Sequence, residues 1–231
     1  MNEVLRQEKK FLISLDQFYR YSQHLGQILK LDSNSQGDGY LIRSLYFDTL
    51  DDKDYHEKED GVELRRKIRL RNYGANTNFA IIEMKQKEGD LQKKRSLRVS
   101  REDAKRLIHG DYSVLLQYTS SFALECYSLL NMLCYRPKAV ITYNRKAYVT
   151  KENNIRITFD HHIKGTESCF DIFSDDLLEN SILDPYLVVL EVKFNGFLLG
   201  YIKDMLNECD TYQLSVSKYC LGRAVSKHYT F

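Results

Sequence analysis

The sequence of 231 residues contains no tryptophan, only two prolines, and no apolar run near the ~18 residues that a membrane-spanning helix requires. Its first ten residues, MNEVLRQEKK, are charged and precede no apolar stretch of the signal-peptide type. It also has no Pro-, Gly- or Ser-rich linker. With 43% hydrophobic residues it can bury a core. We therefore expect a soluble, cytoplasmic protein with a single domain over residues 1–231.

The cysteine and histidine patterns exclude two kinds of site. Five cysteines lie far apart without a CxxC motif, so neither a disulfide framework nor a structural zinc site is expected. His161 and His162 are adjacent, and adjacent residues of a strand point to opposite faces. We therefore expect this pair to have a structural or surface role and not to chelate a metal.

Charge is nearly balanced in total, with 34 Lys and Arg against 32 Asp and Glu, but it is unevenly distributed. No acidic residue occurs between Leu64 and Ile82, whereas five basic residues occupy seven positions there: Arg65, Arg66, Lys67, Arg69 and Arg71. Like charges repel at this density. We therefore expect a negatively charged group to lie nearby.

The periodicity of apolar residues predicts a strand-rich chain with short helices. Strands are predicted at 9–13, 40–47, 62–73, 79–87, 91–99, 139–149, 155–163 and 187–194. Helices are predicted at 15–30 with Ser14 as N-cap, at 48–61, at 101–133, at 197–208 and at 215–226, and 164–185 is expected to be irregular. Because turns or short helices join most strands, we expect an antiparallel sheet and an α+β fold.

Charged residues share one face of several predicted strands, since successive side chains alternate between faces. In ELRRKIRLR, Arg65, Lys67, Arg69 and Arg71 lie opposite Leu64, Arg66, Ile68 and Leu70. The same separation recurs at Glu8 and Lys10, at Glu83, Lys85 and Lys87, at Arg145, at Arg156, Thr158 and Asp160, and at Glu191 and Lys193. If the sheet closes into a barrel, these faces line a charged interior that requires a polyanion. Arginine and lysine suit phosphates, and the few carboxylates would hold Mg²⁺ or Mn²⁺.

One strand leaves its register open. Alternation against Leu97 and Val99 points Gln92, Lys94, Ser96 and Arg98 inward, whereas a shift by one residue would select Lys93 and Arg95.

An ordered set of motifs carries a resemblance to a known family. The segments are RQEKKF (6–11), SLYFD (44–48), KIRLRNYG (67–74), IEMK (82–85), QKKRS (92–96), YNRKAY (143–148), IRITFD (155–160), LEVKF (190–194) and SVSKY (215–219). Together they span nearly the whole chain. The chain resembles the VTC domain, the polyphosphate polymerase branch of the triphosphate tunnel metalloenzyme (CYTH-like) superfamily.

The resemblance implies an eight-stranded antiparallel β-barrel, the triphosphate tunnel, with flanking helices. It also implies a polymerase that transfers the terminal phosphate of ATP to inorganic polyphosphate and releases ADP. The residues that would bind phosphate or act in catalysis are Lys10, Lys67, Arg69, Arg71, Lys85, Lys94, Arg145, Arg156, Lys193 and Lys218. Glu191 would bind the metal ion, Mn²⁺ or Mg²⁺, with Glu8 and Glu83 as helpers.

Departures from the family pattern keep alternatives open. Hydrolytic relatives begin with ExExK, whereas Arg6 replaces the first glutamate here, which favours the polymerase over a hydrolase of tripolyphosphate or nucleoside triphosphates. The chain lacks the SPX domain and the membrane segment of eukaryotic polymerases, so coupling to the inner face of a membrane would require a separate membrane-protein partner. A non-catalytic polyphosphate-binding module is a third alternative. Nucleic-acid binding is disfavoured because the basic residues lie on the concave face.

Overall fold

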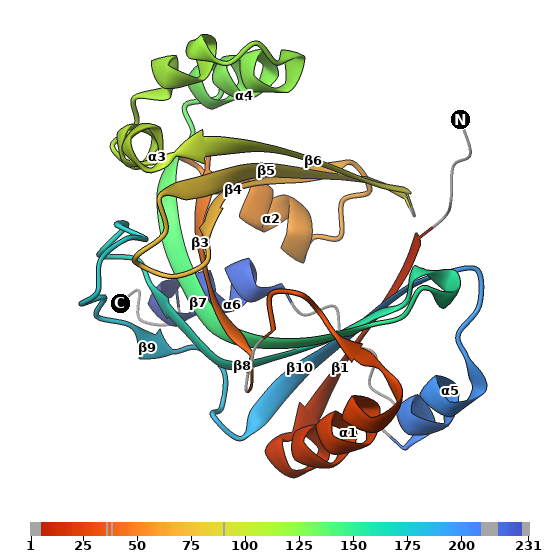
Figure 1. Ribbon diagram of the computed structural model, residues 1–231. Helices are drawn as coiled ribbons and strands as arrows, with labels where there is room; N and C mark the ends of the chain where they lie inside the picture. The colour runs from red at the N-terminus through yellow and green to blue at the C-terminus, as the bar shows by residue number, and fades with distance from the viewer. Residues whose placement is uncertain (1–5, 36, 38, 90, 209–216, 228–231) are drawn as a thin grey trace. The chain divides into compact units, whose positions relative to one another are not determined.

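The computed structural model describes residues 6–35, 37, 39–89, 91–208 and 217–227. Within these residues the strands form an antiparallel sheet with the hydrogen-bonded order β1-β10-β8-β7-β3-β4-β5-β6, while the two-residue strands β2 and β9 pair with β7 and β8 (Figure 1). The predicted α+β class, an antiparallel sheet with flanking helices, is confirmed. Closure of the strands into a tunnel stays a prediction.

The chain divides into two compact units, each assembled from three segments. The first unit draws on residues 1–41, 143–163 and 183–216, and the second on 42–142, 164–182 and 217–231. Both β7 (Arg136–Val149) and β8 (Arg156–Thr166) contribute residues to each unit. The prediction of a single domain is not tested by this division.

The first unit packs two helices against one face of its strands. Its further elements are β1 (Arg6–Ser14), α1 (Leu15–Ile28), β2 (Lys30–Leu31), the 3-10 turn η2 (Glu152–Asn154), β10 (Leu187–Asn195) and α5 (Gly200–Asn207). Ser14 begins α1 as predicted: its hydroxyl accepts a hydrogen bond from the Gln17 amide at 3.1 Å, and the Gln17 side chain accepts one from the Ser14 amide at 2.9 Å. This capping box stabilises the helix by about 1 kcal/mol. Phe18 and Leu25 of α1 then pack on Phe159 and Leu190 of the strands.

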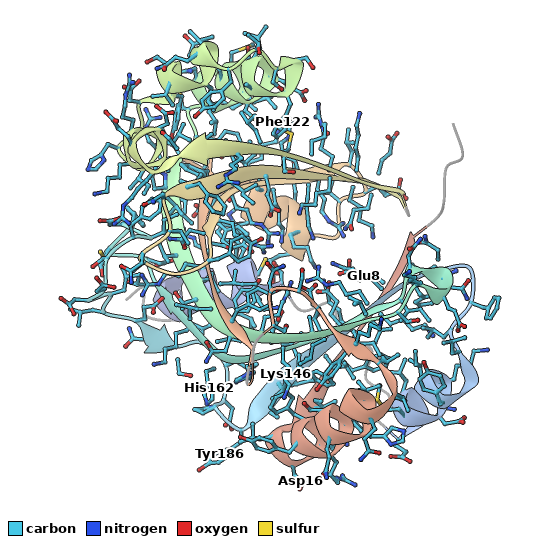
Figure 2. The ribbon with its side chains drawn as sticks, viewed as in Figure 1. Glu8, Asp16, Phe122, Lys146, His162 and Tyr186 are labelled. Atoms are coloured by element: carbon cyan, nitrogen blue, oxygen red, sulfur yellow. The ribbon has the colours of Figure 1, made fainter. Side chains whose placement is uncertain are left out.

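The second unit places its helices on the apolar face of a strongly basic sheet. Its elements are β3 (Tyr40–Asp48), α2 (Lys53–Glu59), β4 (Arg65–Asn72), β5 (Phe79–Glu88), β6 (Leu91–Ser100), α3 (Arg101–Ile108), the 3-10 helix η1 (Tyr112–Gln117), α4 (Ser121–Met132), β9 (Asn180–Ser181) and α6 (Lys218–Lys227). Ile68, Leu70, Ile82 and Met84 are fully buried in its core. Figure 2 shows Phe122 of α4 directed at the sheet, where it lies beneath the guanidinium of Arg95. The charged faces of β4 to β6 are therefore the faces that α3 and α4 leave uncovered.

Four predicted segments differ in the structure. The helix expected over 48–61 extends only over Lys53–Glu59, because Asp48 is still part of β3. The helix expected over 101–133 is divided into α3, η1 and α4, because Gly110 adopts a left-handed φ of 84° and ends the first helix. The segment expected to be irregular contains the end of β8 and the short β9, which pair through Lys164 and Ser181. The last helix begins at Lys218, and residues 215–216 of its predicted range lie outside the described residues. Among the described residues every helix is too short or too polar to cross a bilayer.

Candidate functional site: two charged clusters

Alternate residues of β4, β5 and β6 form four cross-strand rows on one face of the second unit. The rows are Arg71–Ile81–Arg98, Arg69–Glu83–Ser96, Lys67–Lys85–Lys94 and Arg65–Lys87–Gln92. We call this surface the basic face, because eight of its residues are cationic and Glu83 is its one carboxylate. Directly opposed like charges destabilise a sheet. The side chains of this face therefore do not neutralise one another, and the arrangement favours the binding of an anion.

Glu83 lies at the centre of the basic face and holds its cations. Its Oε2 accepts from Arg69 Nε at 2.6 Å and lies 2.6 Å from Arg69 Nη2 and 3.7 Å from Arg71 Nη1, while its Oε1 pairs with Lys94. The Glu83 side chain is 2% exposed, and those of Arg69 and Arg71 are 12% and 8% exposed. Glu83 therefore fixes the two guanidinium groups in a nearly water-free position.

The pKa values reflect this crowding. Burial alone would raise the pKa of Glu83, but the charges of Arg69 and Arg71 outweigh it and hold the pKa well below the usual range. The pKa of Lys94 is lowered by burial, and Arg69 and Arg71 add to this, so that pairing with Glu83 does not restore it. The single carboxylate of Glu83 thus does not neutralise the three cations around it.

Two buried tyrosines contact cations of the basic face. The Tyr46 hydroxyl accepts from Arg69 Nη1 at 3.2 Å, and its ring stacks on Tyr219 at 5.1 Å between centroids. Lys67 lies over the Tyr219 ring at 5.8 Å and donates to the Ser217 hydroxyl at 2.6 Å. Both rings are buried. They therefore orient Arg69 and Lys67 and are not available to stack on a nucleotide base.

Asp48 anchors this tyrosine pair and the start of α2. The carboxylate is fully buried, and its Oδ2 accepts from the Tyr219 hydroxyl at 2.6 Å. Its two oxygens also accept from the backbone amides of Thr49, Asp54 and Tyr55 at 2.8, 2.8 and 3.0 Å. Asp54 and Tyr55 lie in the first turn of α2, so the Asp48 carboxylate binds amides at the start of this helix, although the N-cap residue itself is Asp52.

Asp54 is a buried acid beside Asp48. Its Oδ1 accepts from the Tyr135 hydroxyl at 2.9 Å, whereas its Oδ2 is buried without a hydrogen-bond partner. Burial and the neighbouring Asp48 charge raise the pKa of Asp54 to about 7. Asp54 therefore titrates near neutral pH in the layer that supports the basic face.

The first unit holds a second cluster with balanced charge, which we call the acidic–basic cluster: Glu8, Lys10, Glu191 and Lys193. Glu8 of β1 is labelled in Figure 2 and lies 2.6 Å from the Lys10 ammonium and 3.7 Å from that of Lys193. Glu191 pairs with Lys193 and lies 3.9 Å from Lys10. The two carboxylates therefore share two lysines.

Electrostatics within this cluster fit a cation site. Burial and the Glu191 charge raise the pKa of Glu8, but Lys10 and Lys193 outweigh them and lower it. Burial would lower the pKa of Lys10, but Glu191 and Glu8 raise it above its ordinary value. Glu8 is thus held ionised beside the Glu191 carboxylate, which fits a site for a divalent cation.

Protein ligands alone would not complete such a metal site. Across the described ranges, no group of three or more His, Cys, Asp or Glu side chains is placed to hold a metal ion. Mg²⁺, however, is commonly bound by one or two carboxylates together with substrate phosphates and water. Glu8 and Glu191 therefore fit a metal shared with phosphate. Glu83 fits this role poorly, because Arg69, Arg71 and Lys94 surround it.

Two other predicted phosphate ligands pair with carboxylates of the first unit. Arg145 Nε and Nη2 donate to both oxygens of the fully buried Asp160 at 2.6 and 2.7 Å. Burial would lower the pKa of Arg145, but Asp160 raises it well above its ordinary value. Arg156 Nη2 lies 2.8 Å from Asp32. The sequence indicated the shared face of Asp160 and Arg156, but not these partners.

The structure decides the open register and corrects one expectation. Lys94 lies opposite Lys85 and pairs with Glu83, whereas Arg95 donates to Glu125 on the helical side, so the shifted register is excluded.

The expectation that His161 and His162 point apart is wrong. Their Nδ1 atoms lie 2.8 Å apart because His162 has a left-handed φ of 50°, which breaks the alternation of the strand. Lys218 is the half-buried first residue of α6, and its predicted contact with phosphate stays a prediction.

Comparisons with known proteins agree with this architecture. The model of the VTC domain family matches residues 5–227 of the chain. A candidate adenylate cyclase from Bacillus halodurans has a similar structure, with a TM-score of 0.53 and 15% identity over 92% of this chain and 95% of that chain. A second similar structure is that of a candidate adenylyl cyclase from Hippeastrum, described as having a dominant triphosphatase activity. Its TM-score is 0.56, and the identity is 12% over 94% of this chain and 95% of that chain. No curated protein sequence matches. At these identities the two structures show a shared fold alone.

Proposed function

Because the chain belongs to the VTC domain family, we propose that it is a polyphosphate polymerase that transfers the terminal phosphate of ATP to a growing inorganic polyphosphate chain and releases ADP. The observation that carries this proposal is the basic face, whose cross-strand rows hold eight cations and one carboxylate, Glu83. A linear polyanion of repeated phosphates is the ligand that would neutralise such a surface.

The chemistry requires positioning and charge neutralisation more than proton transfer. Arg69 and Arg71 bind and orient phosphate oxygens, with Glu83 holding Arg69 in place. The attacking terminal oxygen of polyphosphate is already anionic at neutral pH, so no strong general base is needed. Glu191 and Glu8 would hold a Mg²⁺ or Mn²⁺ ion, which would supply charge neutralisation for phosphate. Without a metal ion, Lys10 holds Glu8 in position and Lys193 holds Glu191.

A hydrolase of tripolyphosphate or nucleoside triphosphates is the second candidate. The triphosphatase activity of the Hippeastrum protein, which has a similar fold, favours it. Arg6 counts against it, since it replaces the first glutamate of the hydrolytic motif. A module that only binds polyphosphate is the third candidate, which the paired carboxylates of Glu8 and Glu191 disfavour.

Product analysis distinguishes the three. Purified protein is incubated with ATP and Mn²⁺ or Mg²⁺, and ADP, free phosphate and long-chain polyphosphate are followed separately. ADP matched by growing polyphosphate supports the polymerase, and free phosphate without chains supports the hydrolase. Binding without turnover supports the module.

Two neighbouring lysines provide a matched pair of variants for this assay. Lys94→Ala removes a cation of the basic face, whereas Lys93→Ala removes one from the opposite face of the same strand. We expect turnover to fall about tenfold or more only for Lys94→Ala. Equal activity of the two variants would contradict the site.

A further inference from the structure

The row Arg65–Lys87–Gln92 lies at the end of the basic face that is farthest from Arg71. Arg65 of β4 lies directly opposite Lys87 of β5, and Lys87 lies opposite Gln92 of β6. No acidic residue stands in this row, and opposed like charges destabilise a sheet. The Arg65 guanidinium donates to the Val62 carbonyl at 2.6 Å, which fixes its position without neutralising its charge. Both side chains are half-buried, so a solute can reach them.

The length of the basic face exceeds what a triphosphate needs. Its rows follow one another every two residues, or about 6.8 Å, so that four rows cover about 20 Å. Four P–O bonds separate the outer phosphorus atoms of a triphosphate, and with bonds of roughly 1.5 Å they span at most about 6 Å. A triphosphate therefore reaches across about two rows, such as those of Arg69 and Lys67. The row of Arg65 and Lys87 lies beyond it.

We propose that Arg65 and Lys87 form an outer subsite for inorganic polyphosphate, which binds the part of the chain that extends beyond the phosphates at Arg69 and Arg71. The inference rests on the proposed function in its choice of polyphosphate as ligand. The subsite gives the protein a preference for chains of about seven phosphates or more, the number that about 20 Å accommodates, over tripolyphosphate.

Single-stranded nucleic acid is also a linear polyanion, but this end of the face lacks what such a ligand requires. Base binding needs exposed aromatic rings beside the cations. The two rows at this end contain Lys, Arg and Gln alone, and Tyr219 beneath Lys67 is 1% exposed. The geometry thus favours bare phosphate chains.

The test is equilibrium binding without turnover. Isothermal titration in the absence of ATP compares tripolyphosphate, polyphosphate fractionated to about eight phosphates, and oligothymidylate of similar charge. The variant is Arg65→Gln with Lys87→Gln. The control is Lys93→Gln with Lys105→Gln, which removes the same charge from the opposite face of β6 and from α3. Thermal unfolding of both variants checks that they fold.

We expect the wild type to bind the longer chain more tightly than tripolyphosphate. The Arg65 and Lys87 variant should lose roughly tenfold in affinity for the longer chain, as expected for two partly exposed ion pairs, and keep its affinity for tripolyphosphate. The control should bind both chains as the wild type does.

Three results would overturn the subsite: equal losses for both chain lengths, no loss for the longer chain, or tighter binding of oligothymidylate than of polyphosphate. The proposed function fails separately. If length-dependent binding is lost in the variant as expected but ATP yields no polyphosphate in the product analysis, the subsite stands and the polymerase does not.

Discussion

Replacing Glu83 by glutamine should destabilise the free protein and increase its response to phosphate. In the wild type, the 2% exposed Glu83 carboxylate neutralises Arg69 and Arg71, which are 12% and 8% exposed. Lys94 is 46% exposed, so its ion pair with Glu83 contributes little to the free energy of unfolding. Two nearly buried charge-assisted pairs at about 1.5 kcal/mol each give a loss of about 3 kcal/mol. For a chain of this size, that lowers Tm by roughly 6–12 °C.

The same variant leaves the cations without their carboxylate, so an added polyanion should stabilise it more than the wild type. The assay is thermal unfolding with and without tripolyphosphate. Glu125→Gln serves as control, because Glu125 pairs with Arg95 on the helical side with 37% exposure, and we expect a change below about 1 kcal/mol and an unchanged phosphate response. A Tm decrease of Glu83→Gln below about 2 °C would refute the reasoning. So would a smaller stabilisation by tripolyphosphate than in the wild type.

The depressed pKa of Glu83 also sets the pH range of this effect. Because the folded-state pKa lies below the ordinary value of 4.5, the stability from Glu83 is fully present above pH 4.5. It is lost as the pH falls through the lowered folded-state value. The stability difference between wild type and Glu83→Gln should therefore stay constant from pH 8 to about pH 5. A difference that shrinks within this range would contradict the assignment.

Three further predictions concern single groups. Arg69→Ala or Arg71→Ala should abolish turnover and leave far-UV circular dichroism unchanged; near-normal turnover in both would exclude these residues from the site. Glu191→Ala should remove metal-dependent turnover, with excess Mn²⁺ restoring only part of it; activity indifferent to a chelator would contradict the metal role. Asp54, whose pKa is raised from 3.8 to about 7, favours the folded state while protonated, so its contribution is fully present below the unfolded value of 3.8 and is lost as the pH rises from there through about 7. Asp54→Asn should therefore gain stability relative to the wild type between about pH 4 and pH 7 and no further above that range, and equal pH dependence in denaturant unfolding would rule this out.

Local patterns in the sequence predicted which residues share a face. Alternation placed Ile68 and Leu70 in the core and Arg69 and Arg71 on the opposite side, because each strand buries one face only. The N-cap at Ser14 could also be predicted, because a capping interaction involves only residues within one turn. Most of the basic face could thus be inferred before any strand pairing was known.

Contacts that depend on tertiary structure could not be inferred in this way. The pairing of Arg145 with Asp160 depends on the packing of buried side chains, and the contact between Asp48 and Tyr219 joins residues 171 positions apart. The left-handed conformation of His162 could not be inferred either, because only a few per cent of non-glycine residues adopt it, even though histidine does so more often than most. The role of Glu83 as a metal ligand stays a prediction. The sequence shows a carboxylate on the charged face of its strand, but it does not show the three cations that surround this carboxylate in the structure.

The contact between Asp48 and Tyr219 has a consequence for the order of events on the ribosome. Roughly 120 residues separate the end of β6 from Tyr219, so at 5–20 residues per second the basic strands are made roughly 6–24 s before their support. During that interval the nascent chain carries the cations of the basic face without Tyr219 beneath Tyr46 and Lys67. Affinity for phosphate chains should therefore develop late in synthesis, and a chain that stops before residue 219 would carry these charges without their native arrangement.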